Sequence, residues 1–81
     1  MFKNRTLSGK NNVCGDRVRR LRQAQAPRMS QRALAEKLQL LGLDVDKNAV
    51  QRIESGQRFV TDIELTALRR VFDVTYEDLL G

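Results

Sequence analysis

Apolar residues recur at helical spacing along most of the chain. In the segment 31–41 the adjacent Leu34 and Ala35 are followed by Leu38 and then Leu41 at intervals of three or four positions, which places all four on one side of a helix. Sustained alternation of apolar and polar residues, which is typical of half-buried strands, does not occur in the sequence. The pattern therefore predicts an all-α fold.

Four predicted helix starts carry the same local signal. An apolar residue precedes a Ser, Thr or Asp, and a second apolar residue stands five positions after the first. This spacing is typical of an N-cap flanked by a hydrophobic staple, in which the two apolar side chains pack together across the cap. The four sets are Met29, Ser30 and Leu34; Val45, Asp46 and Val50; Val60, Thr61 and Leu65; and Val74, Thr75 and Leu79.

The helix ends are marked by Pro27, Gly42 and Gly56. Proline interrupts a helix, and a glycine after the last helical residue readily adopts the left-handed conformation that ends it. With Asn12 as the cap of the first helix, these signals predict five short helices. Their expected ranges are 13–25, 31–41, 47–55, 62–72 and 76–80.

One domain over residues 13–81 is expected, because no linker or repeat divides the helical part. Residues 1–12 are polar, basic and aperiodic, and we expect them to form a flexible N-terminal arm. The predicted core is aliphatic and contains Val18, Leu21, Leu34, Ala35, Leu38, Val50, Ile53, Leu65, Leu68, Val71, Phe72, Val74 and Leu79.

Charge is distributed unevenly along the 81 residues. The net charge is +5, but residues 1–41 carry ten basic and two acidic side chains, whereas residues 42–81 carry five basic and eight acidic ones. A basic half of this kind favours a polyanionic partner, most often a nucleic acid. A charge that only keeps the protein soluble is the alternative explanation.

The residue inventory excludes much catalytic chemistry, because the chain has no histidine and one cysteine. Zinc sites, Cys-His dyads and histidine bases are absent, and we expect no enzymatic activity, cofactor or small-molecule substrate. The single Cys14 is expected to be a small core residue. Because one cysteine cannot form an internal disulfide, we expect a cytoplasmic protein. No apolar stretch approaches the roughly 18 residues of a membrane span, so no membrane contact is expected.

The segment 47–55 has a distinctive outer face. On a helical wheel Ala49, Val50 and Ile53 share one side. The opposite side carries Lys47, Asn48, Gln51 and Arg52. In the major groove of DNA, Lys and Arg suit guanine, and Asn and Gln suit adenine. The wheel alone leaves an ordinary solvated face as an equal alternative.

The order of elements around this segment favours the DNA-binding interpretation. Helix 31–41, a short glycine-containing link and helix 47–55 follow one another as in a helix-turn-helix, whose second helix enters the major groove. The first of these helices begins at Ser30 and Gln31, where free backbone N–H groups and the helix dipole can hold a phosphate. Plain capping by Ser30 is the alternative there.

Three stretches resemble the phage repressor and Cro family, the xenobiotic-response-element type of helix-turn-helix protein. They are residues 29–38 with their Ser-Gln and Leu-Ala pairs, residues 50–56 with their Ile-Glu-Ser-Gly end, and residues 74–80 with the final Leu-Leu, and a fourth, shorter stretch is residues 18–22. The resemblance covers about residues 13–81 and implies a compact five-helix fold like that of lambda repressor. It also implies a homodimer that binds double-stranded DNA sequence-specifically, in a bacterial or phage transcriptional regulator, most often a repressor.

The resemblance further implies roles for particular residues. Lys47, Asn48 and Arg52 match positions that usually read bases, with Gln51 as a fourth. Gln31 matches a glutamine that holds a phosphate, with Arg32 beside it, and Arg58 matches a loop that follows the DNA backbone. Arg22 and Glu54 match an ion pair that joins the first helix to the recognition helix.

The chain departs from the commonest members of this family at two connections. The part between Leu38 and Val45 is longer, which predicts a longer helix before the turn, and the link from Arg22 to Ser30 is longer as well. Asp44 lies near the expected path of the phosphates without an evident reason. The run Asp44, Asp46 and Asn48 starts like a calcium loop but lacks the later Gly and Glu that such a loop needs.

A second interpretation is a protein-interaction module of the same fold, such as an antitoxin or adaptor. It requires an exposed apolar patch, which we expect around Leu40, Leu43 and Tyr76. Nonspecific RNA binding is a third interpretation, which the scarcity of aromatic residues for base stacking disfavours.

Overall fold

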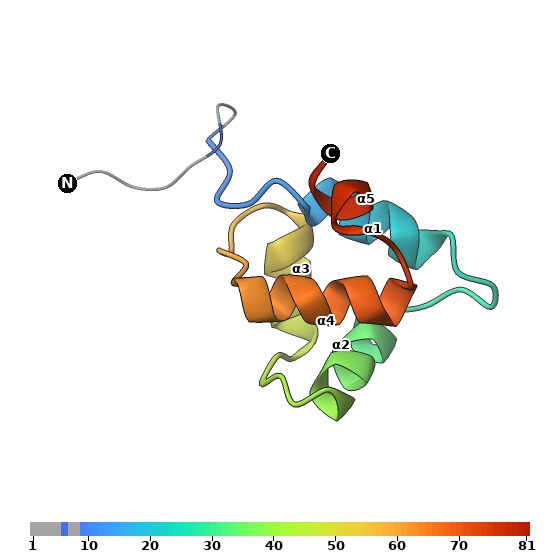
Figure 1. Ribbon diagram of the computed structural model, residues 1–81. Helices are drawn as coiled ribbons and strands as arrows, with labels where there is room; N and C mark the ends of the chain where they lie inside the picture. Colours follow the sequence, from blue (N-terminus) through green and yellow to red (C-terminus); the bar gives the residue numbers. More distant parts are fainter. Residues whose placement is uncertain (1–5, 7–8) are drawn as a thin grey trace.

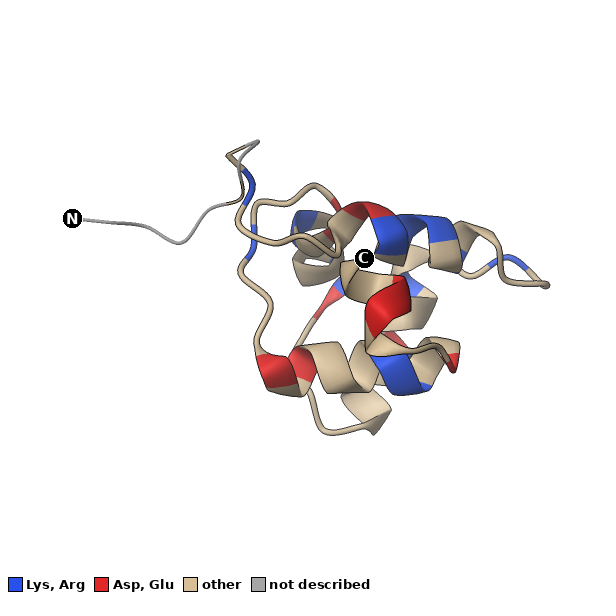
Figure 2. Cartoon of the chain, turned by 45° about the horizontal axis from the view of Figure 1, so that its top comes forward, with Lys and Arg blue, Asp and Glu red and all other residues tan. Residues whose placement is uncertain are grey.

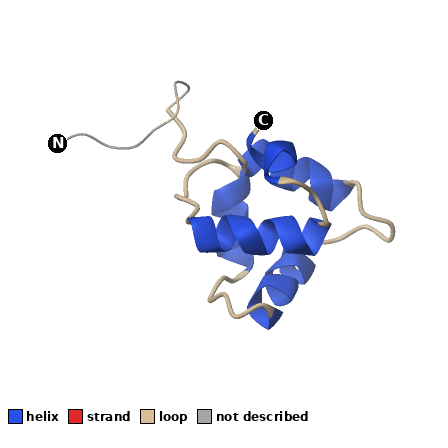
Figure 3. Cartoon of the chain, in the orientation of Figure 1, coloured by secondary structure: helices blue, strands red, loops and turns tan. Residues whose placement is uncertain are grey.

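The computed structural model describes residue 6 and residues 9–81 and consists of five helices with their connections (Figure 1). These are α1 (Gly15–Gln23), α2 (Gln31–Leu40), α3 (Lys47–Glu54), α4 (Asp62–Phe72) and α5 (Tyr76–Leu80). Within the described residues there is no strand (Figure 3). The predicted all-α fold of five helices is confirmed, and α4 and α5 have the expected bounds.

The helices enclose one small core. Helix α3 packs against both α1 and α2, α4 contacts α1 and α2, and α5 lies against α1 and α4 close to the C-terminus (Figure 1). Every residue predicted for the core is buried or packs against buried side chains. Cys14 also belongs to this core, and its burial raises the pKa of the thiol, which keeps it protonated.

The four predicted N-caps are present as hydrogen bonds. In each, the side-chain oxygen accepts from the backbone N–H three residues later, at 3.0 Å for Ser30, 2.8 Å for Asp46, 3.2 Å for Thr61 and 3.1 Å for Thr75. Each cap satisfies an amide that has no partner inside the helix, which stabilises the helix by about 1 kcal/mol. Figure 2 also shows acidic residues at the start of α4 and basic residues at its end, an order that complements the helix dipole.

Helix α1 is shorter than the predicted range 13–25 at both ends. Asn12 does accept a hydrogen bond from the N–H of Gly15 at 2.9 Å, but two bend residues separate this cap from the first helical residue. At the other end the helix stops at Gln23. Pro27 disfavours a helical conformation for Ala26, so the helix ends three residues before the position at which proline itself acts. Helices α2 and α3 end one residue earlier than predicted, each before a glycine with positive φ.

The segment before α1 is attached to the end of α3 and the loop that follows. The Asn12 amide nitrogen donates to the carbonyl oxygens of Ile53 and Arg58, at 3.1 and 2.7 Å. The backbone N–H of Asn11 donates to the carbonyl oxygen of Gly56 at 2.8 Å. Two consecutive asparagines therefore fix the position of α1 relative to the end of α3.

The expectation of a flexible arm over residues 1–12 falls mainly on residues 1–5 and 7–8, which lie outside the described residues. In the described part of this segment, Asn11 and Asn12 are hydrogen-bonded to the domain. Their side chains donate to the carbonyl oxygens of residues 53, 57 and 58. The boundary at residue 13 stays a prediction.

Helix α1 approaches the end of α3 so closely that only glycine fits at residue 15. A Cβ on Gly15 would overlap the backbone carbonyl oxygen of Ile53 and stand 3.0 Å from that of Glu54. We expect Gly15→Ala to lower the free energy of unfolding by about 1–2 kcal/mol, although alanine favours a helix by about 1 kcal/mol over glycine. Urea unfolding measures this, with Gln23→Ala at the exposed end of α1 as control. A stabilised Gly15→Ala protein would contradict the packing.

Candidate nucleic-acid interface

Helix α3 separates its apolar and polar side chains cleanly. Ala49, Val50 and Ile53 are buried in the core. The exposed positions are Lys47, Asn48, Gln51 and Arg52. The one acid of this helix, Glu54, is 4% exposed, so the outer face carries no negative charge. Within the described residues neither cation of this face forms an ion pair, which leaves both available to an external ligand.

The link that joins α2 to α3 is held by its own hydrogen bonds. Gly42 has a φ of 92°, and its N–H donates to the carbonyl oxygen of Gln39 at 2.9 Å. The side-chain amide of Gln39 donates to the carbonyl oxygen of Val45 at 2.8 Å, immediately before the Asp46 cap of α3. These contacts set the direction in which α3 leaves the turn. Asp44 is exposed on this link.

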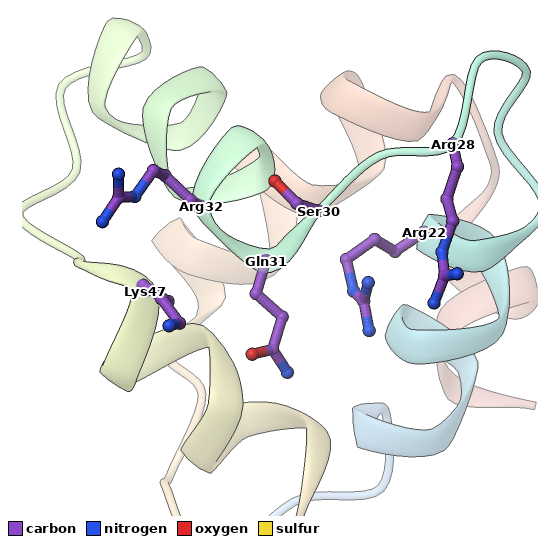
Figure 4. A pocket seen from close by; sticks show the side chains of 6 residues that line it. All are labelled: Arg22, Arg28, Ser30, Gln31, Arg32 and Lys47. Carbon is purple, nitrogen blue, oxygen red and sulfur yellow. The ribbon is translucent and has the colours of Figure 1, made fainter.

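A cationic cleft of about 440 Å³ lies at the start of α2, beside the first residue of α3. Its lining comprises Arg22, Arg28, Ser30, Gln31, Arg32 and Lys47 (Figure 4). In Figure 4 the Gln31 side chain lies between those of Lys47 and Arg22, and Arg28 reaches in from the α1–α2 loop. Four cations line the cleft, and no acid of the described residues does. Arg22 is already paired with Glu54, so Arg28, Arg32 and Lys47 are the cations that attract anions.

Arg28 is a candidate site residue that the sequence pattern does not indicate. It stands in the aperiodic connection between α1 and α2, just after Pro27, where no helical spacing assigns a direction to a side chain. Only the folded chain brings it to the cleft, where Figure 4 shows it beside Arg22, on the side away from Lys47. The sequence offers one indication of its role: Arg28 is basic and stands two positions before Ser30, the cap of α2.

Beneath the cleft, Arg22 and Glu54 form a buried ion pair between α1 and α3. The guanidinium donates twice to the carboxylate, Nε to Oε2 at 2.7 Å and Nη2 to Oε1 at 3.0 Å, in the two-pronged geometry that favours arginine. Arg22 also donates to the carbonyl oxygen of Met29 at 3.1 Å. Gln31 donates from Nε2 to Oε1 of Glu54 at 3.1 Å, so one of its two amide hydrogens is used inside the protein.

Arg58, in the loop after α3, is bonded to Glu64 of α4. Its Nη2 donates to Oε2 of Glu64 at 2.7 Å, and its side chain is 32% exposed. Its Nε is buried and has no hydrogen-bond partner among the residues that the structure describes. The same carboxylate completes the capping box of α4 by accepting from the N–H of Thr61 at 3.0 Å. This ion pair thus joins the loop after α3, which the family resemblance places along the DNA backbone, to α4.

These contacts lower the pKa of the Glu64 carboxyl. Burial alone would raise it, but the hydrogen bond and charge of Arg58, together with the Thr61 N–H, outweigh burial and favour the carboxylate. A group whose pKa is lower in the folded state stabilises the fold above its ordinary pKa of 4.5 and loses that contribution as the pH falls.

We therefore expect Glu64→Gln to be less stable than the original protein by about 1 kcal/mol at neutral pH. Glutamine can still complete the capping box, so the change removes mainly the charge. The difference should shrink as the pH falls below 4.5, because the unfolded carboxyl then takes up its proton while the folded one stays ionised, and it vanishes once the pH is also below the lower pKa of the folded carboxyl. Urea unfolding of both proteins across the acid range measures it, and a difference independent of pH would contradict the assignment.

The paired helices α2 and α3, with a cationic outer face on the second and a cationic cleft at the start of the first, define a helix-turn-helix DNA-binding domain. A family model described as a helix-turn-helix domain matches residues 14–80, and the chain belongs to this family. Comparisons with curated proteins and with solved structures gave no match.

Two further findings concern the described part of the chain. It holds no helix long and apolar enough to cross a membrane. It also holds no group of three or more His, Cys, Asp or Glu side chains placed to bind a metal ion.

Proposed function

We propose that this protein is a transcriptional regulator of the phage repressor and Cro type, which binds a specific double-stranded DNA sequence and acts as a repressor in a bacterium or phage. One observation carries the proposal: the outer face of α3 groups four side chains suited to base edges and no acid. The hydrogen bond from Gln39 to Val45 in the turn before α3 supports it, because a recognition helix must be held at a fixed angle to the groove.

In this proposal the outer face of α3 and the residues around the cleft have different roles. Lys47, Asn48, Gln51 and Arg52 read bases. Gln31, Arg32 and Arg58 contact phosphates, and Arg28 joins them from the α1–α2 loop. Glu54 uses one of the two amide hydrogens of Gln31, and the other can donate to a phosphate. The Arg58 side chain is 32% exposed, and this part can contact a phosphate. Two copies bind a palindromic site, with their recognition helices about 34 Å apart.

Selection of bound sequences from random duplex DNA tests the proposal. We expect a palindromic winner that is bound at least about a thousand-fold more tightly than a scrambled duplex of equal length. Titration of both duplexes at two salt concentrations separates sequence reading from simple charge attraction. Equal, weak and salt-sensitive binding of both duplexes would refute sequence-specific regulation.

Removing Arg28 tests the phosphate role of the cleft. We expect Arg28→Ala to weaken binding by a similar factor on every duplex and to reduce the slope of log affinity against log salt by about one for each bound protomer. Arg70→Ala on α4, an exposed arginine outside the cleft, is the matched control and should leave the slope unchanged. An Arg28→Ala protein with unchanged slope would exclude this residue from the contact.

The alternative of an antitoxin or adaptor module finds partial support in one surface. Leu40 is 87% exposed, but Leu43 is partly buried against the core. Tyr76 is engaged elsewhere: its hydroxyl is 3.1 Å from that of Thr66, and its ring lies 5.2 Å from the Arg69 guanidinium. The patch expected around Leu40, Leu43 and Tyr76 is therefore differently composed, and it does not replace the DNA-binding proposal.

A further inference from the structure

An apolar surface lies where the end of α2 and the following link meet α4. Leu40 and Ile63 are 87% and 69% exposed, and Leu41 between them is also exposed. Leu43 of the link is partly buried beside them. We call these four side chains the α2–α4 surface. Single exposed leucines are common on proteins, whereas neighbouring ones around a hollow are typical of a binding site.

The α2–α4 surface is hollowed rather than flat. One hollow of about 240 Å³ lies between Leu41, Leu43 and Ile63. A second, of about 270 Å³, lies between Leu40, Leu41 and Val71. The two hollows share Leu41 and Arg70, so they lie side by side, and we call the two together the groove.

The α4 side of this groove has the length of a short helical contact. Its lining residues run from Ile63 through Thr66 and Ala67 to Arg70, a stripe of about 10 Å along the helix axis. A groove of this length accepts about two turns of a partner helix, which would insert apolar side chains spaced three or four residues apart.

Cations border the groove. Lys37 and Arg70 line it, no acidic residue does, and within the described residues neither of the two forms an ion pair. A second copy of this chain placed on the same surface about a two-fold axis would bring Lys37 and Arg70 of both copies, four cations in all, into one interface. Their mutual repulsion makes this arrangement unfavourable. An occupant with acidic side chains beside its apolar ones complements the groove instead.

We propose that the α2–α4 surface docks an amphipathic helix of another protein, one whose apolar stripe is flanked by Asp or Glu. None of the four exposed side chains on the outer face of α3 lines this groove, and neither does Arg28. The partner and DNA therefore use separate residues of the domain. This surface gives the protein a protein-binding activity in addition to its DNA binding.

A display library of helical peptides tests this proposal. Each peptide carries leucine at positions i, i+3, i+4 and i+7, and the flanking positions vary among Glu, Gln and Lys. We expect selection on the intact protein to enrich Glu-flanked peptides. The best of these should bind at least about tenfold more tightly than its Lys-flanked counterpart, since charge complementarity decides between them.

Variants of exposed residues locate the binding. Leu40→Ser should weaken the selected peptide at least about tenfold, and the double change of Lys37→Glu and Arg70→Glu should reverse the preference toward Lys-flanked peptides. Gln23→Ala on α1, outside the groove, is the control. DNA affinity of Leu40→Ser should be unchanged, which distinguishes failure here from failure of the proposed regulator function.

Three results would overturn the proposal. They are a library that yields no binder, equal enrichment of Glu-flanked and Lys-flanked peptides, and peptide binding that Leu40→Ser does not weaken. Concentration-dependent self-association abolished by Leu40→Ser, measured by sedimentation, would assign the surface to a second copy and overturn it as well.

Discussion

Replacing Glu54 by alanine is expected to lower the free energy of unfolding by about 3–5 kcal/mol. The substitution leaves the Arg22 guanidinium buried, with 8% of its side chain exposed, and without the carboxylate that accepts two of its hydrogen bonds. It also removes the acceptor of the Gln31 amide. An unpaired charge in the interior costs far more than the intact pair contributes, so a domain of this size approaches unfolding at room temperature.

Urea unfolding followed by circular dichroism measures this loss. Glu36→Ala, which removes an exposed glutamate from α2, is the control and should change stability by less than about 0.5 kcal/mol. Arg22→Ala should be as harmful as Glu54→Ala, whereas the double variant should lose much less than the sum of the two, because no unpaired charge remains. Single losses below about 1 kcal/mol would show that the pair is solvated in solution.

Replacing Arg52 by alanine is expected to cost about 1–3 kcal/mol of affinity on the best DNA site, which is roughly 5-fold to 150-fold. Arg52 is exposed on the outer face of α3 and is not held by any acid in the described part of the chain, so the change leaves the fold intact. The lost affinity should be confined to sites that carry the preferred base, since arginine distinguishes guanine by its paired acceptors.

Titration of the selected site, of the same site with single base changes, and of random DNA separates the two kinds of contact. We expect Arg52→Ala to bind random DNA almost as the original protein does and to discriminate less at one base pair of each half-site. Arg70→Ala serves again as the arginine control. If Arg52→Ala lost the same factor on random DNA, Arg52 would be a phosphate contact.

The helices could be predicted closely because their signals are local. A cap such as Ser30 or Thr61 bonds an amide three residues away, and its apolar neighbours pack within the same turn, so a short stretch of sequence contains the whole interaction. The outer face of α3 was predictable for the same reason, since helical geometry alone decides which side chains share a side.

Contacts between distant segments could not be read from periodicity. The bonds from Asn12 to the end of α3 and the place of Arg28 beside the cleft depend on how helices pack. The Arg58–Glu64 pair spans only six positions, but it starts in a loop to which no helical spacing applies. Gly15 does not stand in a sequence pattern that predicts a turn. Its role becomes visible only in the structure, where the backbone of α3 approaches it closely. The Arg22–Glu54 pair was expected only through the family resemblance, because 32 positions separate the two residues.

Helix α3 is fixed at both ends by residues that take no part in its outer face. Asp46 caps its start, and Asn12 and Arg22 bond its last turn from α1 and the segment before it. The four outward side chains are therefore replaceable without loss of the scaffold that aims them. In the proposed function, new DNA preferences can therefore arise from substitutions at these four positions alone, because the contacts that hold α3 in place are left unchanged.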